Sequence, residues 1–250
     1  MLYSYVVYET VLDLSRKDLR GRSLSPEEFN RVARIVNEKI FSYYYSKFEE
    51  SSENSESMSG FKVLGEAVVV AGGIAALPTS FYHICGMPYY IDTGGVRRRL
   101  DLVSTLEHAK RDMDYLTQAT LTHPTFRFGI ATTTADMTIH VSPATGIGTI
   151  YLDYIRTPNM PYLDYYLNDT TFEYTWMPSG GGNVSVPSGS TARNGTTGAA
   201  IVVSATVDFE WDNEDLPLIC AMFLQEMGVQ LPSSELYEGG TLSETKINAQ

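Results

Sequence analysis

Cysteine is scarce in this 250-residue chain, and the two cysteines that occur, Cys85 and Cys220, lie far apart. Neither belongs to a CxxC pair or to a Cys/His spacing of the kind that binds zinc. We therefore predict no disulfide framework and no metal site, and we interpret both cysteines as small buried hydrophobic residues.

Basic residues are also few, since 18 lysines and arginines stand against 30 aspartates and glutamates, giving a formal net charge of −12 at pH 7. Nucleic-acid binding needs clustered basic side chains that displace counterions, so this balance disfavours tight binding to DNA or RNA. The one basic cluster is Arg97-Arg98-Arg99. It could face the acids of a partner protein, or it could protect an edge strand against aggregation.

Long apolar runs are missing as well. No uninterrupted run reaches the roughly 18 residues of a membrane span. The N-terminus has no basic segment ahead of its apolar residues, which argues against a signal peptide. We expect a soluble protein that is made in a cytoplasm and has no membrane partner.

Catalytic and cofactor motifs are missing too. The histidines show no HExxH spacing, no GxSxG elbow activates a serine, and the glycine-rich stretch lacks the GK[ST] of a phosphate-binding loop. The residues weighed and set aside on these grounds are His83, His108, His123, His140 and Ser190. We predict no catalytic, cofactor-binding or metal-binding residue, and a protein that is not an enzyme.

Acidic residues leave a minor alternative open. Paired carboxylates would suit glycoside hydrolysis, but their separation is not visible in a sequence. The candidates are Asp92, Asp101, Glu107, Asp112 and Asp114. The run 212–215 lacks the ligand spacing of an EF-hand, and the dipole of a following helix explains it. Glycosylation motifs at Asn168, Asn183 and Asn194 are interpreted as chance matches, because no secretory signal precedes them.

Two helices are predicted near the N-terminus. Apolar residues recur at three- and four-residue intervals over residues 2–14. Ser25-Pro26-Glu27-Glu28 then supplies an N-cap serine, a proline at the first helical position and a glutamate three residues after the cap. The second helix should run to about residue 48, and we expect the pair to form an antiparallel hairpin.

The middle of the chain changes to an alternating pattern. Residues 50–60 are acidic and serine-rich, which predicts a mobile linker. The best strand is predicted over residues 200–211, with Ile201, Val203, Ala205, Val207, Phe209 and Trp211 facing one way. Shorter strands are predicted at 126–130, 137–141, 147–155 and 172–176, and one near residue 68.

The C-terminal third has two further features. Residues 179–198 are rich in glycine and poor in large side chains, which predicts a long hairpin arm or loop tip. Apolar residues at helical spacing predict a third helix over 216–227, ended by Gly228. The remaining residues predict an extended tail.

Together these patterns predict an α+β fold, with an N-terminal helical hairpin and a C-terminal helix packed with an antiparallel β-domain that carries the glycine-rich arm. The expected boundaries are 1–49 for the hairpin, 50–60 for the linker and 61–211 for the β-rich domain. The C-terminal helix should occupy 212–229 and the tail 230–250.

Several short phrases occur in a distinctive order. They are SLSPEEFNRVARIVNEKIFSYYYSKFE, IAALPTSFYHI, TLTHPTFRFG, IHVSP and YLDYIRTPNMPY. The matching positions are Ser25 to Asn30, Ala76 to Tyr82, His123 to Phe128, Ile139 to Pro143 and Ile150 to Pro161. In this order the chain resembles the neck and tail ring proteins of tailed bacteriophages, particularly those of crAss-like podoviruses, over most of residues 1 to 165.

The resemblance implies a structural ring subunit of the virion neck or tail, made in the host bacterial cytoplasm, that connects the portal to the tail. Its implied partners are further copies of itself in a closed, twelve-membered ring, the portal protein and other neck or tail proteins. Genomic DNA would pass through the lumen without specific binding, since an acidic channel does not retain it. The 17 tyrosines, among them Tyr43-Tyr44-Tyr45, Tyr89-Tyr90, Tyr162, Tyr165 and Tyr166, could serve either interfaces or the core.

Two other functions stay open. One is a carbohydrate-binding or receptor-binding tail module, in which Tyr89-Tyr90 would stack on sugars. The other is an assembly factor that leaves before the virion matures.

Overall fold

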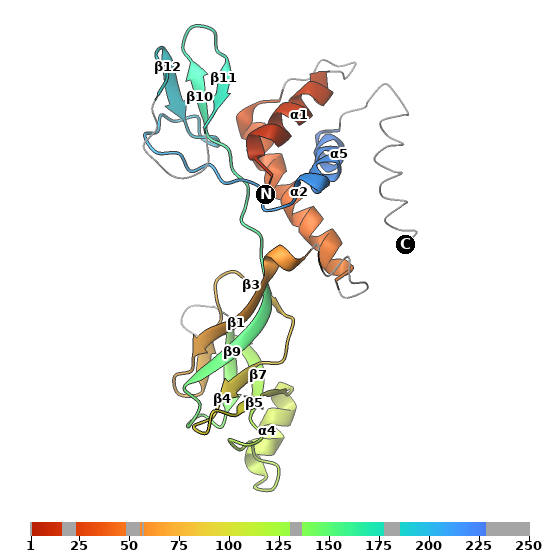
Figure 1. Ribbon diagram of the computed structural model, residues 1–250, viewed down its shortest axis with the longest axis vertical. Coiled ribbons are helices and arrows are strands. Elements are labelled where there is room, and N and C mark those ends of the chain that lie inside the picture. The colour runs from red at the N-terminus through yellow and green to blue at the C-terminus, as the bar shows by residue number, and fades with distance from the viewer. Residues whose placement is uncertain are drawn as a thin grey trace. The chain divides into compact units, whose positions relative to one another are not determined.

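The computed structural model describes residues 2–16, 24–48, 56, 58–130, 137–177 and 186–228. The chain forms two compact units (Figure 1). The helical unit comprises Met1–Asn54 and Pro158–Gln250, and the β-unit comprises Ser55–Thr157. The predicted α+β class is confirmed.

Three helices form the core of the helical unit: α1 (Ser4–Arg16), α2 (Pro26–Ser46) and α5 (Leu216–Met227). α5 packs against both of the others. The ring of Phe29 in α2 lies 5.3 Å from that of Tyr8 in α1 and 5.0 Å from that of Phe223 in α5. Because Phe29 is fully buried, it joins the three helices at one point.

The capping residues found in the sequence start α2 and end α5 in the structure. Ser25 is the N-cap of α2 and accepts a hydrogen bond from the Glu28 amide at 3.2 Å, with Pro26 in the first turn. Gly228 ends α5 with a φ of 66°, a left-handed conformation that glycine adopts without strain. The predicted start of α2 and both ends of α5 are therefore confirmed.

The helical unit also contains a three-stranded antiparallel sheet in the order β11 (Tyr174–Trp176), β10 (Tyr165–Asn168), β12 (Ser190–Arg193). Residues 179–198 were predicted to form a long hairpin arm or loop tip. That prediction is wrong for residues 190–193, because they form β12 and pair with β10 in this sheet. Small side chains favour this close packing. The Gly195 carbonyl, just beyond β12, accepts a hydrogen bond from Asn30 of α2 at 2.8 Å, and a Cβ at Gly195 would overlap the Leu163 carbonyl oxygen. Residues 178–185 lie outside the described residues.

The strand predicted over 200–211 is not formed, since this segment makes only isolated bridges. Val203 is 46% exposed whereas Ser204 and Thr206 are buried, which inverts the predicted faces there. Polar side chains satisfy the backbone instead of a ladder. The Thr206 amide donates to Ser204 Oγ at 3.2 Å, and the Asp164 amide donates to Thr206 Oγ1 at 3.1 Å. An alternating sequence pattern does not distinguish a segment held by such side-chain bonds from a paired strand.

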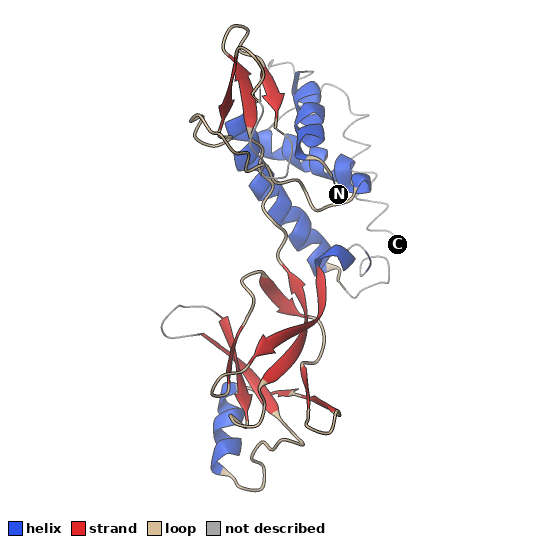
Figure 2. Cartoon of the chain, turned by 60° about the vertical axis from the view of Figure 1, so that its left-hand side comes forward, coloured by secondary structure: helices blue, strands red, loops and turns tan. Residues whose placement is uncertain are grey.

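The β-unit contains two sheets (Figure 2). In the larger, the order is β1 (Lys62–Val69), β9 (Thr149–Arg156), β4 (Tyr89–Ile91), β5 (Arg97–Arg99), with β3 (Phe81–Ile84) also pairing with β9. In the smaller, the order is β2 (Ile74–Ala76), β8 (Met137–Ser142), β7 (Thr125–Ile130), β6 (Asp101–Leu102). Among the described strands, β6 and β7 form the parallel pair and the others are antiparallel. The buried core includes Leu100, Phe126, Ile139, Ile150, Leu152 and Tyr154.

One helix of the β-unit was not predicted. It is α4 (Thr105–Met113), capped by Ser104, whose hydroxyl accepts from the Glu107 amide at 3.2 Å. Its side chains are mostly exposed, so no apolar stripe marked it in the sequence.

The division into units differs from the predicted boundaries, because residues 158–211 belong with the helices rather than with one continuous β-domain. The end of the predicted linker is also part of a fold. Met58 precedes and Phe61 ends a short 3₁₀ turn, Ser59–Phe61, and both side chains are buried. The predicted tail 230–250 and most of the predicted linker lie outside the described residues.

Candidate interaction surfaces

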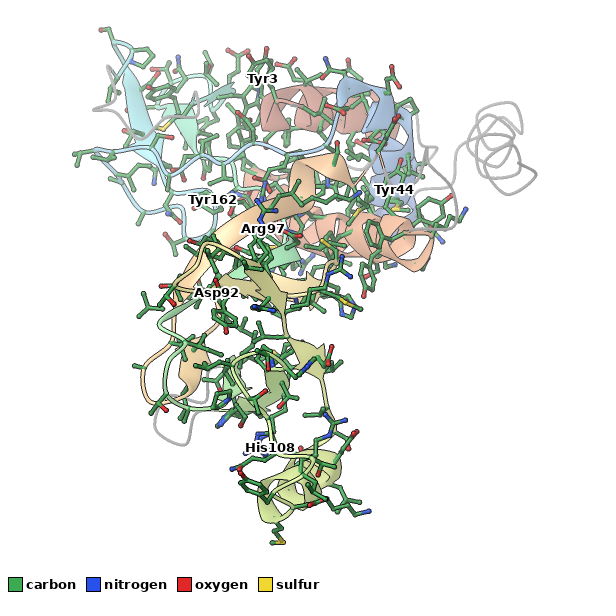
Figure 3. The ribbon with its side chains drawn as sticks, turned by 60° about the horizontal axis from the view of Figure 1, so that its bottom comes forward. Tyr3, Tyr44, Asp92, Arg97, His108 and Tyr162 are labelled. Atoms are coloured by element: carbon green, nitrogen blue, oxygen red, sulfur yellow. The ribbon has the colours of Figure 1, made fainter. Side chains whose placement is uncertain are left out.

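The nearest approach to a catalytic pair is formed by His108 on α4 and Ser142 at the end of β8. Their Nε2 and Oγ atoms are 2.8 Å apart, and His108 is buried (Figure 3). The bond ties α4 to the smaller sheet. His140 lies two residues before Ser142 on the same strand, β8. Burial is the main cause that lowers the pKa of His140, followed by the positive charges of Arg127 and His108.

The remaining histidines and Ser190 are dispersed. His83 lies on β3, His123 lies in the loop before β7, and Ser190 opens β12 in the other unit. Across the described ranges, no three His, Cys, Asp or Glu side chains are close enough together to hold a metal ion.

The carboxylates considered for hydrolysis have structural partners. Asp92 closes the β4–β5 turn, where it accepts hydrogen bonds from the amides of Gly94 and Val96, both at 2.9 Å, and pairs with Arg98 at 3.0 Å. The hydrogen bond from Val96 is the largest cause that lowers the pKa of Asp92. Asp101 lies on the exposed strand β6. The side chain of Asp112 is not among those described.

The other two of these acids meet beside α4. Glu107 forms an ion pair with Arg111, and both line a shallow 490 Å³ hollow with Lys110, Asp114 and Thr117. Its lining thus contains two acids and two bases. The hollow therefore carries no unbalanced negative charge that would suit a hydrolytic pair.

The acidic run 212–215 begins the segment that leads into α5. Asp212 and Asp215 form a reciprocal capping box around residues Asn213–Asp215. Tyr44 Oη donates to Asp215 Oδ1 at 2.5 Å. Burial raises the pKa of Asp215, and the hydrogen bond from Tyr44 opposes that rise. Helix capping thus accounts for two of these acids.

The asparagines of the glycosylation motifs shape turns. Asn168 Oδ1 accepts from the amides of Thr170 and Thr171, and Asn194 Oδ1 accepts from those of Thr196 and Thr197. Asn183 lies outside the described residues.

A groove of about 810 Å³ lies in the helical unit between α2 and residues 160–162. Its walls carry both charges, and Arg31 pairs with Glu28 at 3.8 Å. Tyr162 also lines it, and burial raises the pKa of that phenol. With mixed and locally paired charges, the groove has no clear preference for a charged ligand.

The tyrosines divide between core and surface. Tyr90 is buried and its hydroxyl donates to the Leu121 carbonyl, while Tyr165 and Tyr166 are buried in the three-stranded sheet. Tyr89 points to the opposite face of β4 from Tyr90. It stacks on Tyr151 at 5.1 Å. Tyr89 and Tyr90 therefore do not form a joint stacking platform for a sugar.

Arg97, Arg98 and Arg99 form β5, the edge strand of the larger sheet. Arg98 is tied to Asp92. The guanidinium of Arg97 lies over the Tyr89 ring, 5.0 Å from its centroid. Figure 3 shows Asp92 and Arg97 at this turn. The edge position fits both predicted roles, protection of the edge and contact with a partner's acids.

Four large and strongly exposed apolar side chains of the β-unit lie on α4 and the turn after it. We call them the apolar tip: Leu106, Met113, Tyr115 and Leu116, which are 67%, 89%, 91% and 89% exposed. Leu106 and Met113 are seven residues apart and so share one face of α4. Figure 1 shows α4 and its turn at one end of this unit.

The turn that carries the tip is held by Asp114. Its carboxylate accepts from the Leu116 amide and from Thr117 Oγ1, both at 3.0 Å. Tyr115 and Leu116 are therefore presented by an ordered turn although neither is packed against the fold. The apolar tip was not predicted. Tyr115 and Leu116 stand between polar residues in the sequence, and such a pair looks like part of an ordinary loop.

No model of a known protein family matches the chain, and no curated protein sequence matches it. None of the helices in the described parts of the chain combines the length and the apolar character needed to cross a bilayer.

Proposed function

We propose that this chain is a structural subunit of a multiprotein assembly, without catalytic activity, and that the assembly is the neck or tail of a phage virion. The observation that carries the assembly role is the apolar tip, with four large side chains at least 67% exposed. Burying one such side chain is worth roughly 1.5–3 kcal/mol. Since all four lie on one short helix and the turn after it, they mark a candidate interaction site.

The ordered turn strengthens this argument. Binding a side chain that is already held in place loses less conformational entropy than binding one on a mobile loop. Aromatic residues inserted into a partner's pocket are frequent anchors of protein interfaces. Tyr115, supported by the bonds of Asp114, has the form of such an anchor.

Assignment to a phage neck or tail rests on the order of the sequence phrases described above. In this role the subunit joins a closed ring, which is twelve-membered in the proteins that the chain resembles, below the portal and above the tail. DNA passes through the lumen, and the net charge of −12 would limit its retention there. Contacts with the portal and neighbouring rings are the natural place for the tip.

Replacing one tip residue tests the role of the tip. In phage carrying Leu116→Asp, we expect incorporation of the chain into particles to fall about tenfold or more, because a buried charge at an anchor costs several kcal/mol. Val202→Asp is the matched control, since Val202 is 78% exposed and lies in the helical unit. Normal incorporation of the Leu116→Asp chain would refute a docking role for the tip.

A further inference from the structure

We propose that the solvent-facing side of the β1–β9–β4–β5 sheet, centred on Arg97 and Arg99, binds carboxylates on the helical unit of a second copy of this chain. The inference deepens the proposed function, on which it rests, by naming a contact between neighbouring subunits. It concerns a different surface from the apolar tip.

The geometry places two arginines on one face. In the β4–β5 register, Arg99 lies opposite Tyr89 and Arg97 opposite Ile91. Since side chains alternate along a strand, Arg97 and Arg99 share a face and Arg98 points to the other. Both are exposed whereas Arg98 is half-buried.

Arg97 is held in position by aromatic rings. Its guanidinium lies over Tyr89, and the Tyr89 ring is stacked on Tyr151 with an interplanar angle of 14°. A guanidinium that lies over a ring keeps its N–H groups available for a carboxylate. Less side-chain entropy is then lost when a partner binds.

The two arginines are not neutralised by carboxylates of their own unit. Over the described ranges, no side-chain hydrogen bond and no ion pair joins the Arg97 or Arg99 guanidinium to another residue. In a chain with a net charge of −12, two guanidinium groups without a carboxylate partner in their own unit are available for an external anion.

The complementary charge lies on the other unit. Ser55–Thr157 contains 8 lysines and arginines against 9 acids, whereas the rest of the chain contains 10 against 21. The densest run of described acids is at residues 212–215, where Glu214 is exposed. Complementary patches on two different units of one chain produce a head-to-tail contact, which is the kind that closes into a ring.

Two other classes of ligand fit this surface less well. Base or sugar stacking needs an open ring face, but the Tyr89 ring already has Tyr151 stacked on it and the Arg97 guanidinium lying over it. Phosphate binding is opposed by the acidic balance of the whole chain. A carboxylate needs only the guanidinium edges.

Sedimentation equilibrium of the full chain tests the contact. We expect the weight-average mass to rise with protein concentration at about 50 mM salt and to fall toward that of one subunit at about 500 mM, because salt screens exposed charges. Arg97→Glu with Arg99→Glu should weaken association at least tenfold. Adding Glu214→Arg to that variant should restore part of the loss.

Arg31→Glu with Arg34→Glu is the control, since it changes the net charge equally on two exposed α2 residues. It should leave association as strong as in the wild type. Equal loss in the control would overturn the proposal in favour of general repulsion. Unchanged association in the Arg97/Arg99 variant, or none in the wild type, would also overturn it.

A nucleic-acid partner has its own readout. If a single-stranded oligonucleotide bound the wild type and not the Arg97/Arg99 variant, without salt-sensitive self-association, the carboxylate proposal would be refuted. Leu116→Asp should self-associate normally here. Failure of the arginine contact would therefore leave the role of the tip standing.

Discussion

The side-chain amide of Asn30 donates to the main-chain carbonyl of Gly195 at 2.8 Å, across 165 residues of sequence. The same amide donates to the Leu163 carbonyl at 3.0 Å, and Asn30 Oδ1 accepts from the Leu163 amide at 2.9 Å. Asp164, fully buried, accepts from the Gly195 amide at 2.9 Å. These bonds fasten α2, the segment before β10 and the turn after β12 into one unit.

Asn30→Ala should destabilise the helical unit by about 2–4 kcal/mol, because it leaves three buried main-chain groups without partners. Urea unfolding followed by circular dichroism measures the change. Asn213→Ala, at an exposed position, should stay within about 0.5 kcal/mol of the wild type. Equal stability of the two variants would mean that this network does not hold the unit together.

Gly195→Ala should be still more disruptive. A Cβ there would lie 1.9 Å from the Leu163 carbonyl oxygen and 2.3 Å from Asn30 Nδ2, so the backbone must move. We expect a loss of at least about 3 kcal/mol, at or above the usual range for overpacking. Gly60→Ala meets nothing within 4 Å and is the control. A Gly195→Ala protein as stable as the Gly60→Ala protein would contradict this packing.

Tyr44→Phe should produce a pH-dependent loss of stability. Removing the hydroxyl takes away the bond that opposes the burial-driven rise in the pKa of Asp215, so the folded-state pKa should rise further. Stability linked to a raised carboxyl pKa is present below the ordinary value of 3.8 and is lost as the pH rises through the folded-state value. The loss should therefore be about 1–2 kcal/mol at neutral pH and smaller at about pH 4.5.

Urea unfolding at both pH values tests this sign. Tyr43→Phe, which removes only the contact with Lys47 Nζ at 2.9 Å, should have little effect at either pH. A loss for Tyr44→Phe that grew as the pH fell would show that the Asp215 carboxylate is not stabilised by this bond.

The two cysteines should react at very different rates. Burial raises the pKa of the Cys220 thiol to about 12, whereas Cys85 is only half-buried. Because the thiolate is the reactive form, Cys220 should react with a thiol reagent at least about a hundredfold more slowly than Cys85 in the native protein. Comparing Cys85→Ser with Cys220→Ser at pH 8 measures each alone. Equal rates would show that α5 is not packed as described.

Local patterns predicted α2 and α5 well, although not α4, because the signals that start and end these two helices are local. The Ser25 cap and the Gly228 stop act within one turn of the residues they end. The strands at 125–130, 137–142 and 149–156 were also close to prediction. Segment 200–211 failed because its backbone partners are polar groups elsewhere in the chain, Asp164 among them, which no local pattern reveals.

The interaction surfaces were only partly predictable. The arginine run was visible in the sequence, but its edge position depends on β4 and its alignment depends on Tyr151, 54 residues away. The apolar tip was not predictable from the sequence. Tyr115 and Leu116 are exposed because no other part of their unit packs against them, and a sequence pattern does not show tertiary packing. The predicted boundary between the β-rich domain and the C-terminal helix was misplaced for a different reason. The helical unit is built from both ends of the chain, and such a unit has no continuous sequence pattern.

Absolute quantification of this chain by mass spectrometry of purified virions tests the central claim most directly. A ring subunit must be present at a near-integer ratio to the portal protein. The proposed twelve-membered ring predicts a ratio of about one to a portal of the same symmetry. Absence from mature particles would contradict a virion role and favour an assembly factor. A variable or strongly substoichiometric amount would contradict a closed ring.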